Sequence, residues 1–304
     1  MINLPKPHGE KLFALLNNEK LPKSDMLRIE KTINEYQNWR NKLININNDA
    51  NTLDLMIKEL NEYKKYIDVD LIFDSENDFL YRQKGQLKLD NSIIEEFLPI
   101  LINNIYSEFL VNKGIFIGPT QCFSSLLFES NIANLYKGGG VNIRSKDQDF
   151  AISRKIFIQT SHYDDFRDSI SLTSNIAYVA AECKTNLDKT MFQGGAATAL
   201  DVKNSVPGAK YFLICEWLDM TPISSSLTAI DEILILRKAK RISSNIRSQF
   251  SSYKNRLKHR DYFINYLEKY PFSADVFARF LNQIEKAIGK NDLNINDVLN
   301  RGYF

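Results

Sequence analysis

The residues best suited to chemistry lie at the ends of two apolar, strand-like runs. Asp149 begins the run DFAIS, and Glu182, Cys183 and Lys184 follow the run IAYVAA. Alternation along a strand places Glu182 and Lys184 on one face and Cys183 on the other. A neighbouring strand can bring Asp149 beside them. Paired carboxylates with nearby oxygens suit Mg²⁺ better than zinc, so the pattern predicts metal-assisted phosphodiester hydrolysis.

Lys184 would orient the attacking water or neutralise the charge that develops on the phosphorus centre. Asp147 competes with Asp149, which is preferred because it directly abuts the strand. In an alternative interpretation, Glu182 and Lys184 form only a structural ion pair on a surface strand. The apolar strand, the acid on a preceding strand and a following helix rich in small residues favour the active site.

Helical periodicity predicts the elements of the first part of the chain. We expect helices from Ser24 or Asp25 to about Ile46, from Leu53 to Tyr66, from Asn91 to Leu110 and over about Cys122 to Tyr136. The acidic stretch from Asp68 to Leu89 is expected to be a loop with a short hairpin. These segments would serve as scaffold.

The pattern changes after Gly138, Gly139 and Gly140, which are expected to form a loop. Residues 141–161 predict a hairpin or a long bent strand, 175–186 a buried central strand, Asp188 to about Asn204 a helix, and 209–219 and 230–236 further strands. Residues 273–300 read as helical. The order predicts an α/β or α+β fold with a mixed sheet flanked by helices. The expected regions are 1–110 (helical), 111–236 (catalytic core) and 237–304 (basic, mainly helical).

Composition restricts the remaining possibilities. The chain has 304 residues, 44% of them hydrophobic, which is enough for a substantial core. Three cysteines and three histidines are too few and too scattered for a disulfide framework or a zinc cluster. The N-terminus lacks the pattern of a signal peptide, and no apolar run is long enough to span a membrane, so we expect a cytoplasmic protein.

A basic segment near the C-terminus predicts contact with a polyanion. Residues 237–260 contain nine Lys and Arg and no Asp or Glu: Arg237, Lys238, Lys240, Arg241, Arg247, Lys254, Arg256, Lys258 and Arg260. Such a segment can neutralise DNA phosphates, although a solvated helical face has the same composition. Arg144 and Lys146, beside Asp149, are further candidates for contact with the DNA backbone.

The arrangement of Asp149, Glu182 and Lys184 resembles the PD-(D/E)XK nuclease superfamily over about residues 122–218. The resemblance implies that Asp149 and Glu182 bind Mg²⁺, that the main-chain carbonyl of Cys183 completes the metal shell, and that Lys184 is catalytic. Gln148 stands where the proline of the motif would precede the acid. The superfamily often adds an acid from an earlier helix, for which Glu129 or Glu108 are candidates, and a polar residue from the following helix, here Gln193.

More narrowly, the segments GGGVNIRSKDQDFAISRKIFIQTS and AECKTNLDKTMFQ resemble type II restriction endonucleases of the group containing BbvCI and DdeI. The resemblance implies cleavage of double-stranded DNA at a short site by a homodimer, or by a heterodimer with a related subunit. Two alternatives remain open. One is a repair or recombination nuclease of the same superfamily, and the other is a DNA-binding or assembly protein without catalytic activity.

Overall fold

The structure, a computed structural model, describes residues 4–288 and 295–302. In this part of the chain one mixed sheet has the order β1-β2-β3-β4-β5. Its strands are β1 (Phe116–Phe128), β2 (Val141–Thr160), β3 (Ile170–Leu187), β4 (Lys210–Leu218) and β5 (Glu232–Ile235). The first three strands pair antiparallel, and β3, β4 and β5 pair in parallel. The predicted mixed sheet with flanking helices is confirmed.

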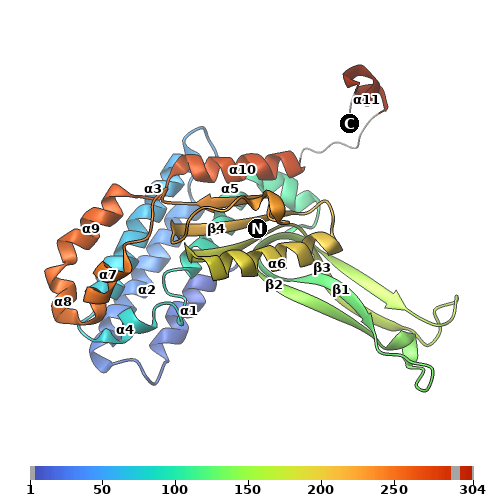
Figure 1. Cartoon of the computed structure of the whole chain (residues 1–304), viewed down its shortest axis with the longest axis horizontal. Coiled ribbons are helices and arrows are strands. Elements are labelled where there is room, and N and C mark those ends of the chain that lie inside the picture. The colour runs from blue at the N-terminus through green and yellow to red at the C-terminus, as the bar shows by residue number, and fades with distance from the viewer. Residues whose placement is uncertain (1–3, 289–294, 303–304) are drawn as a thin grey trace.

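Helices cover both faces of this sheet (Figure 1). On one face lies α6 (Lys189–Ser205), which begins where the Asp188 side chain accepts a hydrogen bond from the Met191 N–H at 2.9 Å. Small residues let α6 approach the sheet closely, since a Cβ on Gly195 would lie 2.5 Å from a methyl carbon of Leu213. The predicted helix after Lys184 and the strands on either side of it are therefore confirmed.

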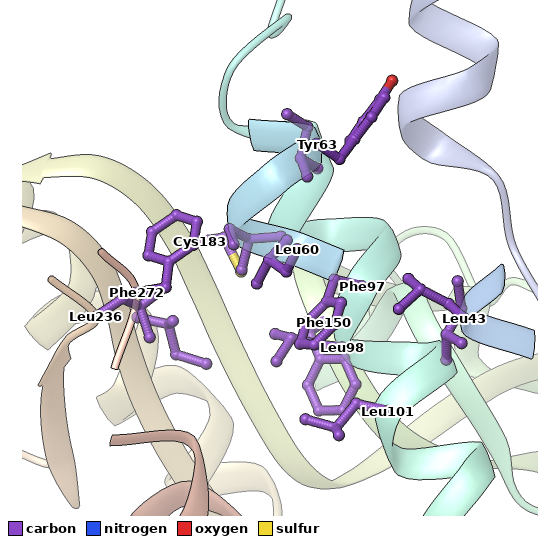
Figure 2. Packing of buried hydrophobic residues seen from close by; sticks show 14 of the residues in the cluster. Leu43, Leu60, Tyr63, Phe97, Leu98, Leu101, Phe150, Cys183, Leu236 and Phe272 are labelled. Carbon is purple, nitrogen blue, oxygen red and sulfur yellow. The ribbon is translucent and has the colours of Figure 1, made fainter. Parts of the chain in front are cut away.

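The opposite face packs against helices from both ends of the chain. They are α1 (Pro7–Leu16), α2 (Lys23–Ile44), α3 (Thr52–Tyr66), α5 (Ser92–Asn112) and α10 (Ala274–Ile288). Their apolar side chains form one core with sheet residues that include Phe150 and Cys183, as Figure 2 shows. The three regions expected from the sequence thus share a single core. No helix in the described residues is long and apolar enough to cross a bilayer.

Two local predictions are wrong. The segment expected to be a helix over Cys122 to Tyr136 instead consists of the second half of strand β1, which pairs with β2, and a turn after Phe128. The segment expected to be a loop with a hairpin over Asp68 to Leu89 is instead helical in two places, a π-helical turn (Ile67–Phe73) and α4 (Asp78–Gln83). The buried Asp68 pairs with Lys64 at 2.6 Å, so this acid belongs to the interior and not to a loop.

The chain after the sheet forms short helices around one side of the molecule. These are α7 (Ser244–Arg247), α8 (Tyr253–Lys258) and α9 (Arg260–Lys269), with a 3₁₀ turn (Ser248–Ser251) between α7 and α8. The helix expected over 273–300 is divided into α10 and α11 (Ile295–Arg301), with residues 289–294 outside the described part. At the far end, β1, β2 and β3 extend beyond the helices as a long projection (Figure 1).

Candidate active site

The site forms where β2 and β3 separate. Their pairing ends at Phe150 and Ala181, so the residues beyond this pair lack a β2 partner on that side. The Cys183 N–H donates instead to Asp149 Oδ2 at 3.0 Å, and the Cys183 carbonyl accepts a hydrogen bond from Asn91 Nδ2 at 2.9 Å. Side chains thus complete the hydrogen bonds of the open strand edge, and they fix Asp149 beside the start of α5.

The three residues singled out by their spacing meet at this fork. Lys184 Nζ lies 3.6 Å from Asp149 Oδ2 and 3.4 Å from Glu182 Oε2. The side chains of Asp149 and Glu182 are 18% and 16% exposed, so they are partly desolvated yet open to solvent. Cys183 is buried on the opposite face, among the apolar residues of Figure 2. Glu182 and Lys184 therefore lie on one face of β3 and Cys183 on the other, as the alternation of side chains along a strand predicted.

The first turn of α5 adds an acid that sequence reasoning missed. Glu95 is buried and accepts a hydrogen bond from Asn91 Nδ2 at 3.0 Å. Lys88 Nζ bridges Glu95 Oε1 at 3.2 Å and Asp149 Oδ1 at 3.4 Å. Burial first, and then the Asp149 charge, raise the pKa of Glu95. Glu95 stands 54 residues before Asp149 in the sequence. The one local feature that could have marked it as a site residue is its position in the first turn of a helix that follows a polar turn.

Electrostatics keeps Lys184 charged. Burial alone would lower the pKa of its ammonium group, but the carboxylates of Asp149 and Glu182 outweigh burial, and the pKa is raised. Tyr211 on β4 faces Glu182 from within the core, and burial followed by the Glu182 charge raises the pKa of its phenol. The hydroxyl of Tyr211 has no hydrogen bond of ordinary geometry. The site therefore combines fixed carboxylates with a permanent cation.

Other predicted candidates lie outside this cluster. Glu129 is exposed in the turn after β1, where its N–H donates to the Gly140 carbonyl, and Glu108 is exposed near the far end of α5. Gln193 is exposed on α6. Asp147 is exposed on β2 and makes none of the contacts that hold Asp149. In the part of the chain that the structure describes, no group of three His, Cys, Asp or Glu already surrounds a metal position.

The basic segment is only partly available to a ligand. Arg256 is completely buried and donates to the carbonyls of Phe73 and Ser75 and to Asp78. Arg237 is buried and pairs with Glu216 at 2.7 Å. The prediction that these two arginines contact DNA is wrong, because their guanidinium groups neutralise interior acceptors.

The other cations of the segment are more accessible. Lys238 pairs with Asp275, Arg260 with Asp74, and both Arg241 and Arg247 with Asp219, all with at least one-quarter of the cation side chain exposed. Lys240, Lys254 and Lys258 are exposed and form no ion pair within the described residues. On β2, Arg144 and Lys146 both lie near Asp201 of α6, at 3.8 and 3.2 Å.

A cavity of about 80 Å³ lies beside the basic segment. Thr185, which follows Lys184, and Asp90, which precedes Asn91, line it together with Arg241 and Arg247. Burial, and then the neighbouring Arg241, lower the pKa of Arg247. Arg241 and Arg247 thus lie near the chain neighbours of Lys184 and Asn91, whereas Asp149 and Glu182 do not line the cavity.

Comparison with known proteins identifies the family of the chain. The sequence profile of the Bpu10I restriction endonuclease matches residues 86–304, and no curated protein matches the chain significantly. A solved structure titled "native BbvCI A2B2 tetramer at low resolution" shares 20% identity with a TM-score of 0.48, over 85% of this chain and 96% of that one. The profile covers most of the chain, including Glu95, Asp149, Glu182 and Lys184, and confirms the resemblance to restriction endonucleases. The chain belongs to the Bpu10I restriction endonuclease family.

Proposed function

We propose that the chain is a Mg²⁺-dependent type II restriction endonuclease that hydrolyses phosphodiester bonds of double-stranded DNA at a short specific sequence. The observation that carries the proposal is the position of Lys184 Nζ, within 3.6 Å of both Asp149 and Glu182 at the open fork of β2 and β3. Family membership supports nuclease activity, and the site geometry supports the roles of the residues.

The residues present fit a divalent cation. Glu95, Asp149 and Glu182 contribute three carboxylates, against the two ammonium groups of Lys88 and Lys184, which leaves one net negative charge. The pKa of Glu95 is raised first by burial and then by the negative charge of Asp149. An added cation would relieve the repulsion between these two carboxylates. Asp149 and Glu182 would hold Mg²⁺ with the Cys183 carbonyl, and Glu95 would support it. A bound Mg²⁺ would polarise the phosphate and lower the pKa of a water ligand.

Lys184 is assigned an electrostatic role. Its raised pKa keeps the side chain an ammonium ion at neutral pH, so it cannot accept the proton of the attacking water. An ammonium group beside the carboxylates can instead orient that water and stabilise negative charge on the phosphate in the transition state. Lys184 is held for this role by Asp149 and Glu182 from two directions.

DNA binding is assigned to cations that remain accessible. Arg241 and Arg247 are partly exposed beside the cavity, and Lys240, Lys254 and Lys258 are exposed in the same segment. Arg144 and Lys146 would contact the backbone from β2. Each phosphate contact releases counterions, so affinity should fall steeply as salt rises. Because cleavage of two strands needs two sites, we also propose a homodimer or a heterodimer with a related subunit.

The test compares wild type with Asp149→Asn, Glu182→Gln and Lys184→Met on plasmid and phage DNA with Mg²⁺. Asp147→Asn is the matched control, since this acid is two residues from Asp149 and outside the cluster. Discrete fragments are expected from wild type and the control, with a loss of at least about 10²-fold in the three site variants. Full activity in Asp149→Asn or Glu182→Gln would refute the site.

Metal binding gives a second readout that needs neither DNA nor a partner subunit. Titration of Mn²⁺ into the protein, followed by calorimetry, should show binding in wild type and in Asp147→Asn. Binding should be lost or strongly weakened in Asp149→Asn and Glu182→Gln, because each removes one anionic ligand. Equal Mn²⁺ binding by all four proteins would show that these carboxylates do not hold the metal.

A further inference from the structure

Lys88 is a second basic residue of the site, beside Lys184, and the sequence did not single it out. It lies in the turn before α5, and its ammonium group is shared between Glu95 Oε1 at 3.2 Å and Asp149 Oδ1 at 3.4 Å. Both distances are longer than the roughly 2.7–2.9 Å of a strong charge-assisted hydrogen bond, which favours an exchangeable contact over a permanent one. The side chain is 44% exposed.

The main chain at Lys88 is fixed although the side chain is accessible. Its φ is 51°, in the left-handed region that residues other than glycine rarely adopt. The Lys88 carbonyl accepts hydrogen bonds from the Ser92 hydroxyl at 2.6 Å and from the Ser92 N–H at 3.2 Å. The Ser92 hydroxyl in turn lies 2.9 Å from His8 Nδ1 in the core. This network holds an unfavourable backbone conformation that aims Lys88 at the carboxylates.

The two oxygens of Asp149 have different partners. Oδ2 receives the Cys183 N–H at 3.0 Å and lies near Lys184, whereas Oδ1 faces Lys88. Oδ1 is thus the oxygen that shares a cation with Glu95. A divalent ion that Asp149 and Glu182 hold with support from Glu95 would compete with the Lys88 ammonium, because both cations are attracted to the same carboxylate oxygens of Glu95 and Asp149.

We propose that Lys88 is a built-in counter-cation that holds Glu95 and Asp149 together in the metal-free enzyme and is displaced when a divalent cation binds. The inference rests on the proposed metal dependence of the site. Lys88 acts as a positioning residue: it pairs with the carboxylates of both Glu95 and Asp149 and offsets their mutual repulsion while no metal is bound. It also lowers metal affinity, because its two ion pairs must break first.

The experiment titrates Mn²⁺ into DNA-free protein by calorimetry, for wild type and Lys88→Met, with Lys88→Gln as a second neutral variant. Lys88→Arg retains the positive charge. Lys84→Met is the matched control, since Lys84 is in the same turn but lies over the Tyr81 ring, 4.5 Å from its centroid. A thermal melt establishes that each variant is folded.

We expect Lys88→Met and Lys88→Gln to lower the Mn²⁺ Kd roughly three- to tenfold, because the metal no longer has to break two partly exposed ion pairs. Lys88→Arg and Lys84→Met should stay near wild type. Unchanged or weaker binding in both neutral variants, while Asp149→Asn abolishes it, would overturn the inference and leave the proposed function intact. If wild type itself bound no Mn²⁺, the proposed metal dependence would fall, and the role of Lys88 with it.

Discussion

Replacing Arg237 by methionine should destabilise the protein and leave its direct DNA contacts untouched. The Arg237 side chain is 3% exposed and pairs with Glu216 at 2.7 Å and with Asp68 at 3.8 Å. It also donates to the Tyr270 carbonyl at 2.8 Å and lies over the rings of Trp217 and Phe272. Lys64 is the other cation of this buried cluster.

The magnitude follows from the charges left behind. With methionine at position 237, Lys64 alone would face the carboxylates of Asp68 and Glu216, so one negative charge would be buried without compensation. Breaking a buried ion pair by removing one partner costs about 3–5 kcal/mol, a large part of the stability of a typical domain. A second change, Glu216→Met, should recover part of the loss, because the remaining Lys64–Asp68 pair is neutral.

Urea unfolding of wild type, Arg237→Met and Arg237→Met/Glu216→Met measures these free energies. Lys254→Met is the matched control from the same basic segment, on the exposed side of α8. It should change the free energy of unfolding by less than about 0.5 kcal/mol. It should instead reduce the slope of log affinity against log salt concentration by about 1, the value expected for one lost phosphate contact. If Arg237→Met unfolded like wild type and lost salt-dependent affinity, our assignment of Arg237 to the interior would be refuted.

Two further predictions concern stability. Burial, and then Lys64, lower the pKa of His8 to about 3 from its usual 6.5, so the folded state holds it neutral between Ser92 and Tyr63. As pH falls from 6.5 towards 3 only the unfolded chain gains this proton, so stability should drop by about 2 kcal/mol between pH 7 and pH 5 in urea titrations. His8→Gln should make the free energy of unfolding less dependent on pH in this range. The same pH dependence in His8→Gln and wild type would contradict the prediction. Gly195→Ala should lower the melting temperature and reduce the free energy of unfolding by about 1–3 kcal/mol, because the added Cβ would clash with Leu213. Gly194→Ala should be neutral or stabilising, because the space around the neighbouring Gly194 is open. Equal melting of both glycine variants would rule out the close approach of α6.

Local patterns in the sequence were enough to predict the centre of the fold. Strand β3, helix α6 and strand β4 have unambiguous apolar runs, and the Asp188 cap marks the start of α6. Because side chains alternate along a strand, the same runs placed Glu182 and Lys184 together. Asp149 was found because it abuts the next apolar run. These predictions depend on neighbours within a few residues, which the sequence alone supplies.

Other elements depend on partners distant in the sequence. The segment of β1 contains Gly118, Pro119 and two serines, and its strand conformation follows from pairing with β2. The acidic segment after Tyr66 looks like a loop, but Asp68 is neutralised by Lys64 and Arg237, and Asp78 by Arg256. Local propensity cannot anticipate such compensation, since the partner of Asp78 lies 178 residues away.

The sequence by itself determined the strand–helix–strand core, the triad of Asp149, Glu182 and Lys184, and the chemical character of the site. Only the tertiary structure decided that Glu95 and Lys88 join that site, and which cations of the basic segment stay exposed. The physical reason is that a charged side chain is defined by its surroundings: the same arginine is a surface ligand for phosphate or an interior counter-ion, depending on the acid that folding brings beside it.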